Sequence, residues 1–102
     1  MSWEVQIDTE RNSMTLCGEL TIFSVQDIHR QFLEALKTLD ELQVDLSGVT
    51  EVDTAGLQLM LLAKRKPGKT VRFSHHSDAV LRHIDLANLG QTLGDPLILR
   101  AQ

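Results

Sequence analysis

The histidines and the single cysteine are the side chains that most readily bind metals or act as nucleophiles, and here they form no recognisable catalytic or metal site. His75 and His76 are adjacent, so in an extended segment they point to opposite sides. Neither has a cysteine or acid nearby at the spacing of zinc ligands. Cys17 has no lysine or arginine beside it that would favour a thiolate. We therefore expect surface histidines and a buried, structural thiol.

Sites for phosphates, nucleotides or nucleic acids are also missing from the sequence. The six glycines are scattered and match neither a phosphate-binding loop nor a dinucleotide fingerprint. Three phenylalanines, one tryptophan and no tyrosine argue against a stacking platform for bases, and the net charge of −4 argues against a nucleic-acid binder. The sequence predicts a protein that is not an enzyme and has no catalytic residue, no metal, no cofactor and no nucleic-acid partner.

The most informative segment is the junction at residues 44–57, VDLSGVTEVDTAGL. Asp53 and Thr54 stand where the free N–H groups at the start of a helix need acceptors, so either side chain can cap that helix. Ala55 and Gly56 leave the first turn nearly bare, at a helix cost of about 1 kcal/mol for the glycine. A bare turn lets another backbone approach closely.

The helix that follows this junction is apolar nearly all round, with leucine, methionine or alanine at positions 57 and 59–63. Such a helix needs apolar neighbours on more than one side. Two interpretations stay open: a second protein covers part of the helix, or the domain buries it completely.

The elements that position this junction follow from hydrophobic periodicity. Alternation predicts strands, and apolar residues three or four apart predict helices, in the order β-β-α-β-α-β-α. Ser24 is expected to cap the first helix, and a tight loop is expected between the third strand and the second helix. The expected strands are 3–8, 14–20, 42–47, 70–73 and a short edge strand at 96–100; the expected helices are 24–39, 54–66 and one from 77 or 78 to about 88–90.

The element order predicts a single α/β domain over residues 1–102. A hairpin followed by right-handed crossovers produces a mixed sheet. All the strands alternate, so we expect helices on one face and water on the other. No signal peptide is visible, the longest apolar run is the five residues 59–63, and one cysteine suits a reducing compartment, so we expect a cytoplasmic protein.

The junction resembles the signature of STAS domains, the family of bacterial anti-sigma factor antagonists. The matching residues are Asp45-Leu46-Ser47-Gly48-Val49 and Val52-Asp53-Thr54-Ala55-Gly56-Leu57, with Gly18-Glu19-Leu20 upstream as the second landmark. The element order fits the family over essentially the whole chain. The resemblance implies the STAS fold, an α/β fold with a four-stranded mixed sheet and helices mainly on one face.

The resemblance also implies a function. In that family the residue after the aspartate is a phosphorylatable serine or threonine, which corresponds to Thr54 here. The partner is a serine/threonine kinase that is also the anti-sigma factor, and a phosphatase removes the phosphate. Unmodified antagonist binds the kinase and frees the sigma factor. The partner surface is expected to comprise Asp53, Thr54, Ala55, Gly56 and Leu57, with Gln58 and the loop residues Thr21, Ile22, Phe23 and Ser24 at its rim.

Two other relatives remain open as alternatives. Many kinase-regulated members carry an aspartate directly after Gly-Glu-Leu, where this chain has Thr21. The Asp-Thr form resembles the STAS subunit of the bacterial lipid-transport ABC complex that maintains outer-membrane asymmetry, in which the domain binds the ATPase subunit. It also resembles the stand-alone STAS proteins of chemotaxis-type signalling clusters.

Overall fold

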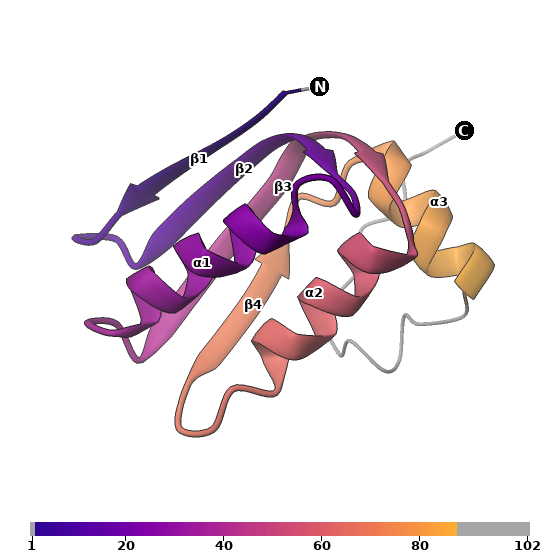
Figure 1. Cartoon of the computed structure of the whole chain (residues 1–102). Helices are drawn as coiled ribbons and strands as arrows, with labels where there is room; N and C mark the ends of the chain where they lie inside the picture. The colour runs from indigo at the N-terminus through magenta and orange to yellow at the C-terminus, as the bar shows by residue number, and fades with distance from the viewer. Residues whose placement is uncertain (1, 88–102) are drawn as a thin grey trace.

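A computed structural model describes residues 2–87 of the chain. The predicted order of elements is confirmed over this range (Figure 1). The predicted end of the third helix near 88–90 and the predicted strand at 96–100 lie outside the described residues. The elements are β1 (Trp3–Asp8), β2 (Ser13–Leu20), α1 (Val25–Leu36), β3 (Glu41–Val52), α2 (Thr54–Lys64), β4 (Thr70–Ser74) and α3 (Asp78–Ala87).

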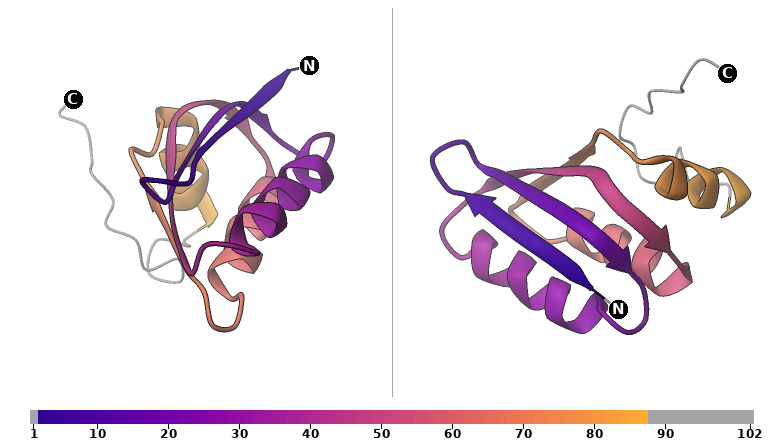
Figure 2. Two further views of the ribbon diagram at one scale, coloured as in Figure 1. Left: turned by 90° about the vertical axis from the view of Figure 1, so that its left-hand side faces the viewer. Right: turned by 90° about the horizontal axis from the view of Figure 1, so that it is seen from above.

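The four strands form one mixed sheet in the order β1-β2-β3-β4. β1 and β2 are an antiparallel hairpin, whereas β2, β3 and β4 run parallel. α1 and α2 connect the parallel strands and lie on the same side of the sheet (Figure 2). Both connections are crossovers of the same hand, which places their helices on the same face. The predicted mixed α/β fold is confirmed.

The core lies between the sheet and its helices. Alternate strand residues point inward and are buried, as periodicity predicts. The rings of Phe32 on α1 and Phe73 on β4 meet edge to face, with centroids 6.3 Å apart. The inward strand residues are Met14, Leu16, Leu20, Leu42, Val44, Leu46, Val49, Val52, Val71 and Phe73, and the helices add Ile28, Phe32, Ala35, Leu36, Leu57, Leu59, Met60, Ala63, Val80 and Ile84.

The expected tight loop before the second helix is absent. β3 continues to Val52, so Asp53 follows the strand directly and α2 begins at Thr54. Two irregularities in the pairing with β2 accommodate the extra residues of β3. They reset the alternation, and Val49 and Val52 therefore still face the core.

The helices differ from the prediction at their ends and caps. α1 ends at Leu36 and α2 at Lys64, each two or three residues early. Ser24 occupies the position before α1, but its hydroxyl makes no cap bond to that helix. Ser77 does cap α3, since its Oγ accepts a hydrogen bond from the backbone N–H of Val80 (3.3 Å).

Two expectations about reactive side chains are wrong. The chain turns at His75, whose φ is +54°, so the alternation of an extended segment no longer applies there. His75 is exposed, but His76 is buried. Cys17 is half-buried rather than buried. Met14 and Leu16 point towards the helices, so by strand alternation Cys17 points to the face of the sheet that the helices leave open.

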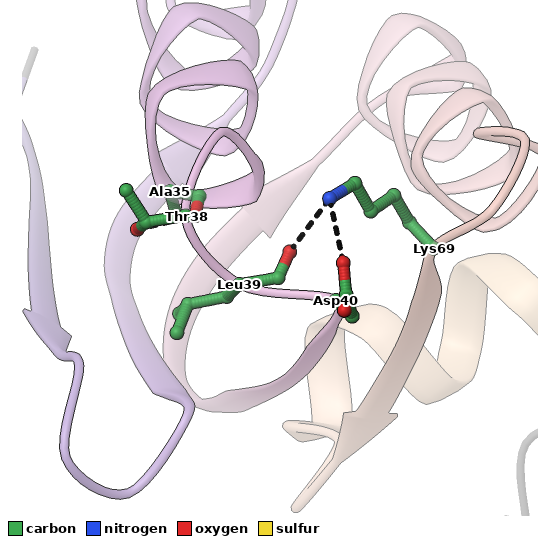
Figure 3. A network of polar contacts seen from close by, with 5 residues as sticks. All are labelled: Ala35, Thr38, Leu39, Asp40 and Lys69. Atoms are coloured by element: carbon green, nitrogen blue, oxygen red, sulfur yellow. Dashed lines mark hydrogen bonds and ion pairs between the residues drawn. The ribbon is translucent and has the colours of Figure 1, made fainter.

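A polar network joins two loops at the end of the sheet where β3 and β4 begin (Figure 3). Lys69 Nζ donates to the carbonyl oxygen of Leu39 (3.2 Å) and to Asp40 Oδ1 (2.9 Å). The backbone N–H of Thr70 donates to the Asp40 carbonyl (2.8 Å). The α1–β3 and α2–β4 connections are therefore tied together, which leaves the opposite end of the sheet to carry the candidate site.

Candidate functional site

Asp53 organises the end of the sheet where β3 passes into α2. Its backbone is extended, with φ −125° and ψ −175°, as expected of a residue that precedes a helix. Oδ1 accepts from the Gly56 N–H (3.0 Å) and Oδ2 accepts from the Ile22 N–H (2.9 Å). The sequence left open which side chain caps α2, and the structure shows that Asp53 does.

Thr54 is the first residue of α2 and is exposed. No hydrogen bond within residues 2–87 engages its hydroxyl. The free N–H groups and the macrodipole at a helix start favour negative charge. Thr54 is therefore an accessible hydroxyl at a position where the fold tolerates an added anion.

An exposed stripe runs along α2 from Thr54. Gln58 and Leu62 follow at i+4 and i+8, and the Leu62 side chain is 57% exposed. Five residues on the other faces of the helix are buried within the domain, and Ala55, Leu61 and Lys64 are half-buried; the buried ones are Gly56, Leu57, Leu59, Met60 and Ala63. The sequence left open whether the domain itself or a second protein covers this apolar helix. The domain buries most of its apolar residues, and Leu62 is the large apolar side chain of α2 that stays exposed. Leu62 was not among the residues that the sequence predicted for the partner surface, although the apolar pattern of this helix included it.

The loop between β2 and α1 divides into two buried and two exposed residues. Ile22 is 62% exposed and Phe23 is 74% exposed, whereas Thr21 and Ser24 are buried. Ser24 Oγ accepts from the Thr21 N–H (3.0 Å) and donates to the carbonyl of Glu19 (2.7 Å). This internal bonding explains why Ser24 does not cap α1, and it turns Ile22 and Phe23 outward.

We name the exposed residues of this region the Thr54 surface. It comprises Ile22, Phe23, Thr54, Gln58 and Leu62. The hydrogen bond from Ile22 to Asp53 links its loop half to its helix half.

Two carboxylates lie close to this surface. Glu19 and Glu51 are direct partners in the pairing of β2 with β3. The pKa of Glu51 is raised above its ordinary value, chiefly because its side chain is hydrogen-bonded to Glu19 and repelled by the charge of Glu19. Burial and the charge of Asp53 raise this pKa further. The end of the sheet next to Thr54 is thus negatively charged.

Within the range that the structure describes, the surroundings of His75 do not form a serine–histidine–aspartate relay. His75 has Ser74 Oγ and Asp45 Oδ2 near it, at 3.2 Å and 3.7 Å, but both face the same ring nitrogen, Nδ1. A serine–histidine–aspartate relay needs both ring nitrogens. Burial by itself would raise the pKa of Asp45. Hydrogen bonds from Ser47 and the electrostatic attraction of His75 together exceed this effect, so the pKa of Asp45 lies below its ordinary value. Within residues 2–87, no three His, Cys, Asp or Glu side chains are grouped so as to hold a metal ion.

Comparison with known proteins identifies the family. The family model described as "Mlab, STAS domain" matches residues 3–99. The chain belongs to the STAS domain family. An anti-sigma factor antagonist from Mycobacterium paratuberculosis has a similar structure, with a TM-score of 0.79, 18% identity, and coverage of 97% of this chain and 87% of that one. The anti-sigma factor antagonist SpoIIAA in its unphosphorylated form gives a TM-score of 0.68 and 18% identity, over 88% and 84% of the two chains. None of the curated protein sequences matches.

The family and fold expected from the two sequence landmarks are therefore confirmed. At 18% identity, the similar structures establish the fold of this STAS domain and nothing further. None of its helices within residues 2–87 has the length and apolar character that crossing a bilayer would require.

Gly56 of this STAS domain lies inside the domain. A Cβ on it would collide with the carbonyl oxygen of Leu20 and would lie 2.9 Å from Leu20 Cγ. The backbone that approaches the bare first turn is therefore that of β2. Leu57 is also buried, whereas Ala55 is half-buried.

Proposed function

We propose that this STAS domain is a cytoplasmic, non-enzymatic regulator whose Thr54 surface binds a serine/threonine kinase that acts as an anti-sigma factor. Phosphorylation of Thr54 releases that partner, and a cognate phosphatase restores binding. The observation that carries the proposal is an accessible Thr54 hydroxyl at the start of the helix that carries the exposed Leu62. Thr54 directly follows Asp53, to which the loop with the exposed Ile22 and Phe23 is hydrogen-bonded. Of the residues expected to bind the partner, Thr21, Ser24, Gly56 and Leu57 support this surface from beneath.

The apolar part of the Thr54 surface would contribute to the free energy of association. Its isoleucine, phenylalanine and leucine are 62%, 74% and 57% exposed. Full burial of such a side chain contributes about 1.5–3 kcal/mol, so covering the exposed fractions of all three contributes roughly 3–6 kcal/mol.

A phosphate on Thr54 would act on binding more than on folding. It carries about −1.5 to −2 charge at neutral pH. The start of α2 stabilises that charge, and Asp53 already caps the helix without help from the Thr54 hydroxyl. A partner packed on Ile22 and Phe23 would face the added bulk and a negative charge that Asp53 and Glu51 reinforce.

The test measures the affinity of wild type, Thr54→Ala and Thr54→Glu for an anti-sigma serine kinase of the same organism by calorimetry. Thr54→Ala should bind within about threefold of wild type, and Thr54→Glu at least about tenfold more weakly, although one charge imitates a phosphate only in part. All three should unfold at nearly the same temperature, since surface changes usually stay within about 0.5 kcal/mol.

The matched control is Thr9→Glu, which adds the same charge to an exposed threonine in the β1–β2 turn. It should bind like wild type. Incubation with the kinase and ATP should place a phosphate on Thr54, read by mass spectrometry. Equal affinities of wild type, Thr54→Ala and Thr54→Glu would leave Thr54 without a regulatory role.

A second candidate is an accessory subunit that binds the ATPase of a lipid-transport ABC complex. Two observations favour it. Thr21 replaces the acid of many kinase-regulated relatives, and it is buried with its Oγ1 near the Phe23 N–H (3.4 Å). The matching family model is described by the name Mlab and not as an anti-sigma factor antagonist. Here Thr54→Ala itself should lose binding to the ATPase subunit, because the uncharged hydroxyl makes the contact.

A further inference from the structure

One carboxylate connects the two halves of the Thr54 surface. Asp53 Oδ1 accepts from Gly56 in the first turn of α2, and Oδ2 accepts from Ile22, 31 positions earlier in the chain. We propose that Asp53 is a positioning residue: it sets the place of the Ile22–Phe23 tip relative to Thr54 and so tunes partner affinity without touching the partner. This inference rests on the proposed function in so far as it concerns the partner.

The other backbone N–H groups of the loop bond within the loop. Thr21 donates to Ser24 Oγ (3.0 Å), Phe23 approaches Thr21 Oγ1 (3.4 Å) and Ser24 donates to the Thr21 carbonyl (2.9 Å). In the part of the chain that the structure describes, the Ile22 N–H is thus the one loop amide that is bonded to the start of α2. The loop keeps its own shape and is bonded to β2 through Ser24, and the bond to Asp53 fixes its tip relative to the start of α2.

Side-chain packing does little to hold the tip, because most of Ile22 and Phe23 is exposed. A hydrogen bond to an ionised carboxylate is stronger than one between neutral groups, so it is suited to this task. A tip that is already in place loses less conformational freedom when a partner binds. Without the bond to Asp53 the partner would have to order the tip itself.

The first measurement needs no partner. Asp53→Ser keeps an oxygen that can cap α2 but cannot reach two N–H groups at once. In the full chain, amide exchange followed by NMR should show Ile22 exchanging about tenfold faster or more, because the lost bond is to a charged acceptor. Amides of the strands should keep their rates, and Asp53→Asn, which has one acceptor oxygen, should behave similarly.

Asp8→Ser is the matched control. Asp8 Oδ1 also lies within hydrogen-bond distance of two backbone N–H groups, those of Glu10 (3.0 Å) and Arg11 (3.2 Å), but in the β1–β2 turn. This variant should leave the exchange of Ile22 and the affinity for the kinase unchanged. Unchanged Ile22 exchange in Asp53→Ser would overturn the positioning role, whatever the partner does.

The second measurement is a double-mutant cycle with the anti-sigma kinase as the probe. Asp53→Ser should weaken binding about tenfold in the wild-type background and much less in Phe23→Ala, where the positioned ring is gone. Equal, additive losses in both backgrounds would overturn the link between Asp53 and the tip in binding. If Phe23→Ala alone binds like wild type, the partner surface of the proposed function fails, and the exchange of Ile22 still decides the positioning role.

Discussion

Replacing Gly56 by alanine tests whether the bare first turn of α2 serves the domain or a partner. The glycine is buried, and an added Cβ would meet the backbone of Leu20 in β2 at its carbonyl oxygen and, 3.1 Å away, at its carbonyl carbon. The same carbonyl oxygen accepts from the Asp53 N–H (3.3 Å). The substitution must therefore push α2 away from β2 and weaken the bond that joins Asp53 to that strand.

Two opposing effects set the magnitude. Forcing an extra carbon into a packed site costs about 1–3 kcal/mol. The upper half of that range applies here, because the obstacle at Leu20 is backbone that cannot swing aside. Alanine is the better helix former by about 1 kcal/mol, which offsets part of the cost. Gly56→Ala should therefore lower the free energy of unfolding by about 1–2 kcal/mol, which corresponds to a decrease in Tm of roughly 5–15 °C.

The assay is thermal and urea unfolding, with Gln58→Ala, an exposed change in the same helix, as the control. The control should stay within about 0.5 kcal/mol of wild type. If Gly56→Ala is as stable as wild type or more so, the close approach to Leu20 is refuted, since helix propensity alone would then govern the outcome. A loss of partner binding with unchanged stability would instead favour the sequence-based interpretation of the bare turn.

The remaining predictions concern the two ends of the sheet. Lys69→Met should lower the free energy of unfolding by about 1 kcal/mol, because it removes the hydrogen bond to the Leu39 carbonyl, whereas Lys66→Met, at an exposed position in the same connection, should have little effect in urea unfolding. Glu51→Gln should stabilise the domain at neutral pH. In the folded protein Glu19 raises the pKa of Glu51 above the value of 4.5 that applies to the unfolded chain. The wild-type protein therefore loses stability as the pH rises from 4.5 through the pKa of the folded state. The gain measured by Tm should therefore vanish below pH 4.5 and grow towards neutrality, and a gain that is independent of pH would contradict this cause.

Local chemistry in the sequence was enough to predict the elements and the start of α2. Apolar residues that alternate with polar ones indicate a strand, and apolar residues three or four positions apart indicate one face of a helix. Each of these patterns can be recognised within a short segment of the sequence. Asp53 and Thr54 identified the helix start because capping involves residues only three apart. The hairpin, the crossovers and the mixed sheet followed from element order, and the two family landmarks led to the STAS fold.

Only the tertiary structure decided which residues of the site face outward. Gly56 meets Leu20, and Asp53 reaches Ile22, because β3 pairs with β2 in one particular register and delivers α2 beside the β2–α1 loop. Short-range patterns carry no information about such pairs, which are more than thirty positions apart. The Ala-Gly turn looks equally bare whether a partner or the chain's own strand covers it. An apolar residue such as Leu62 likewise has the same periodicity whether it is covered or exposed, and only the packing of the neighbouring elements determines which.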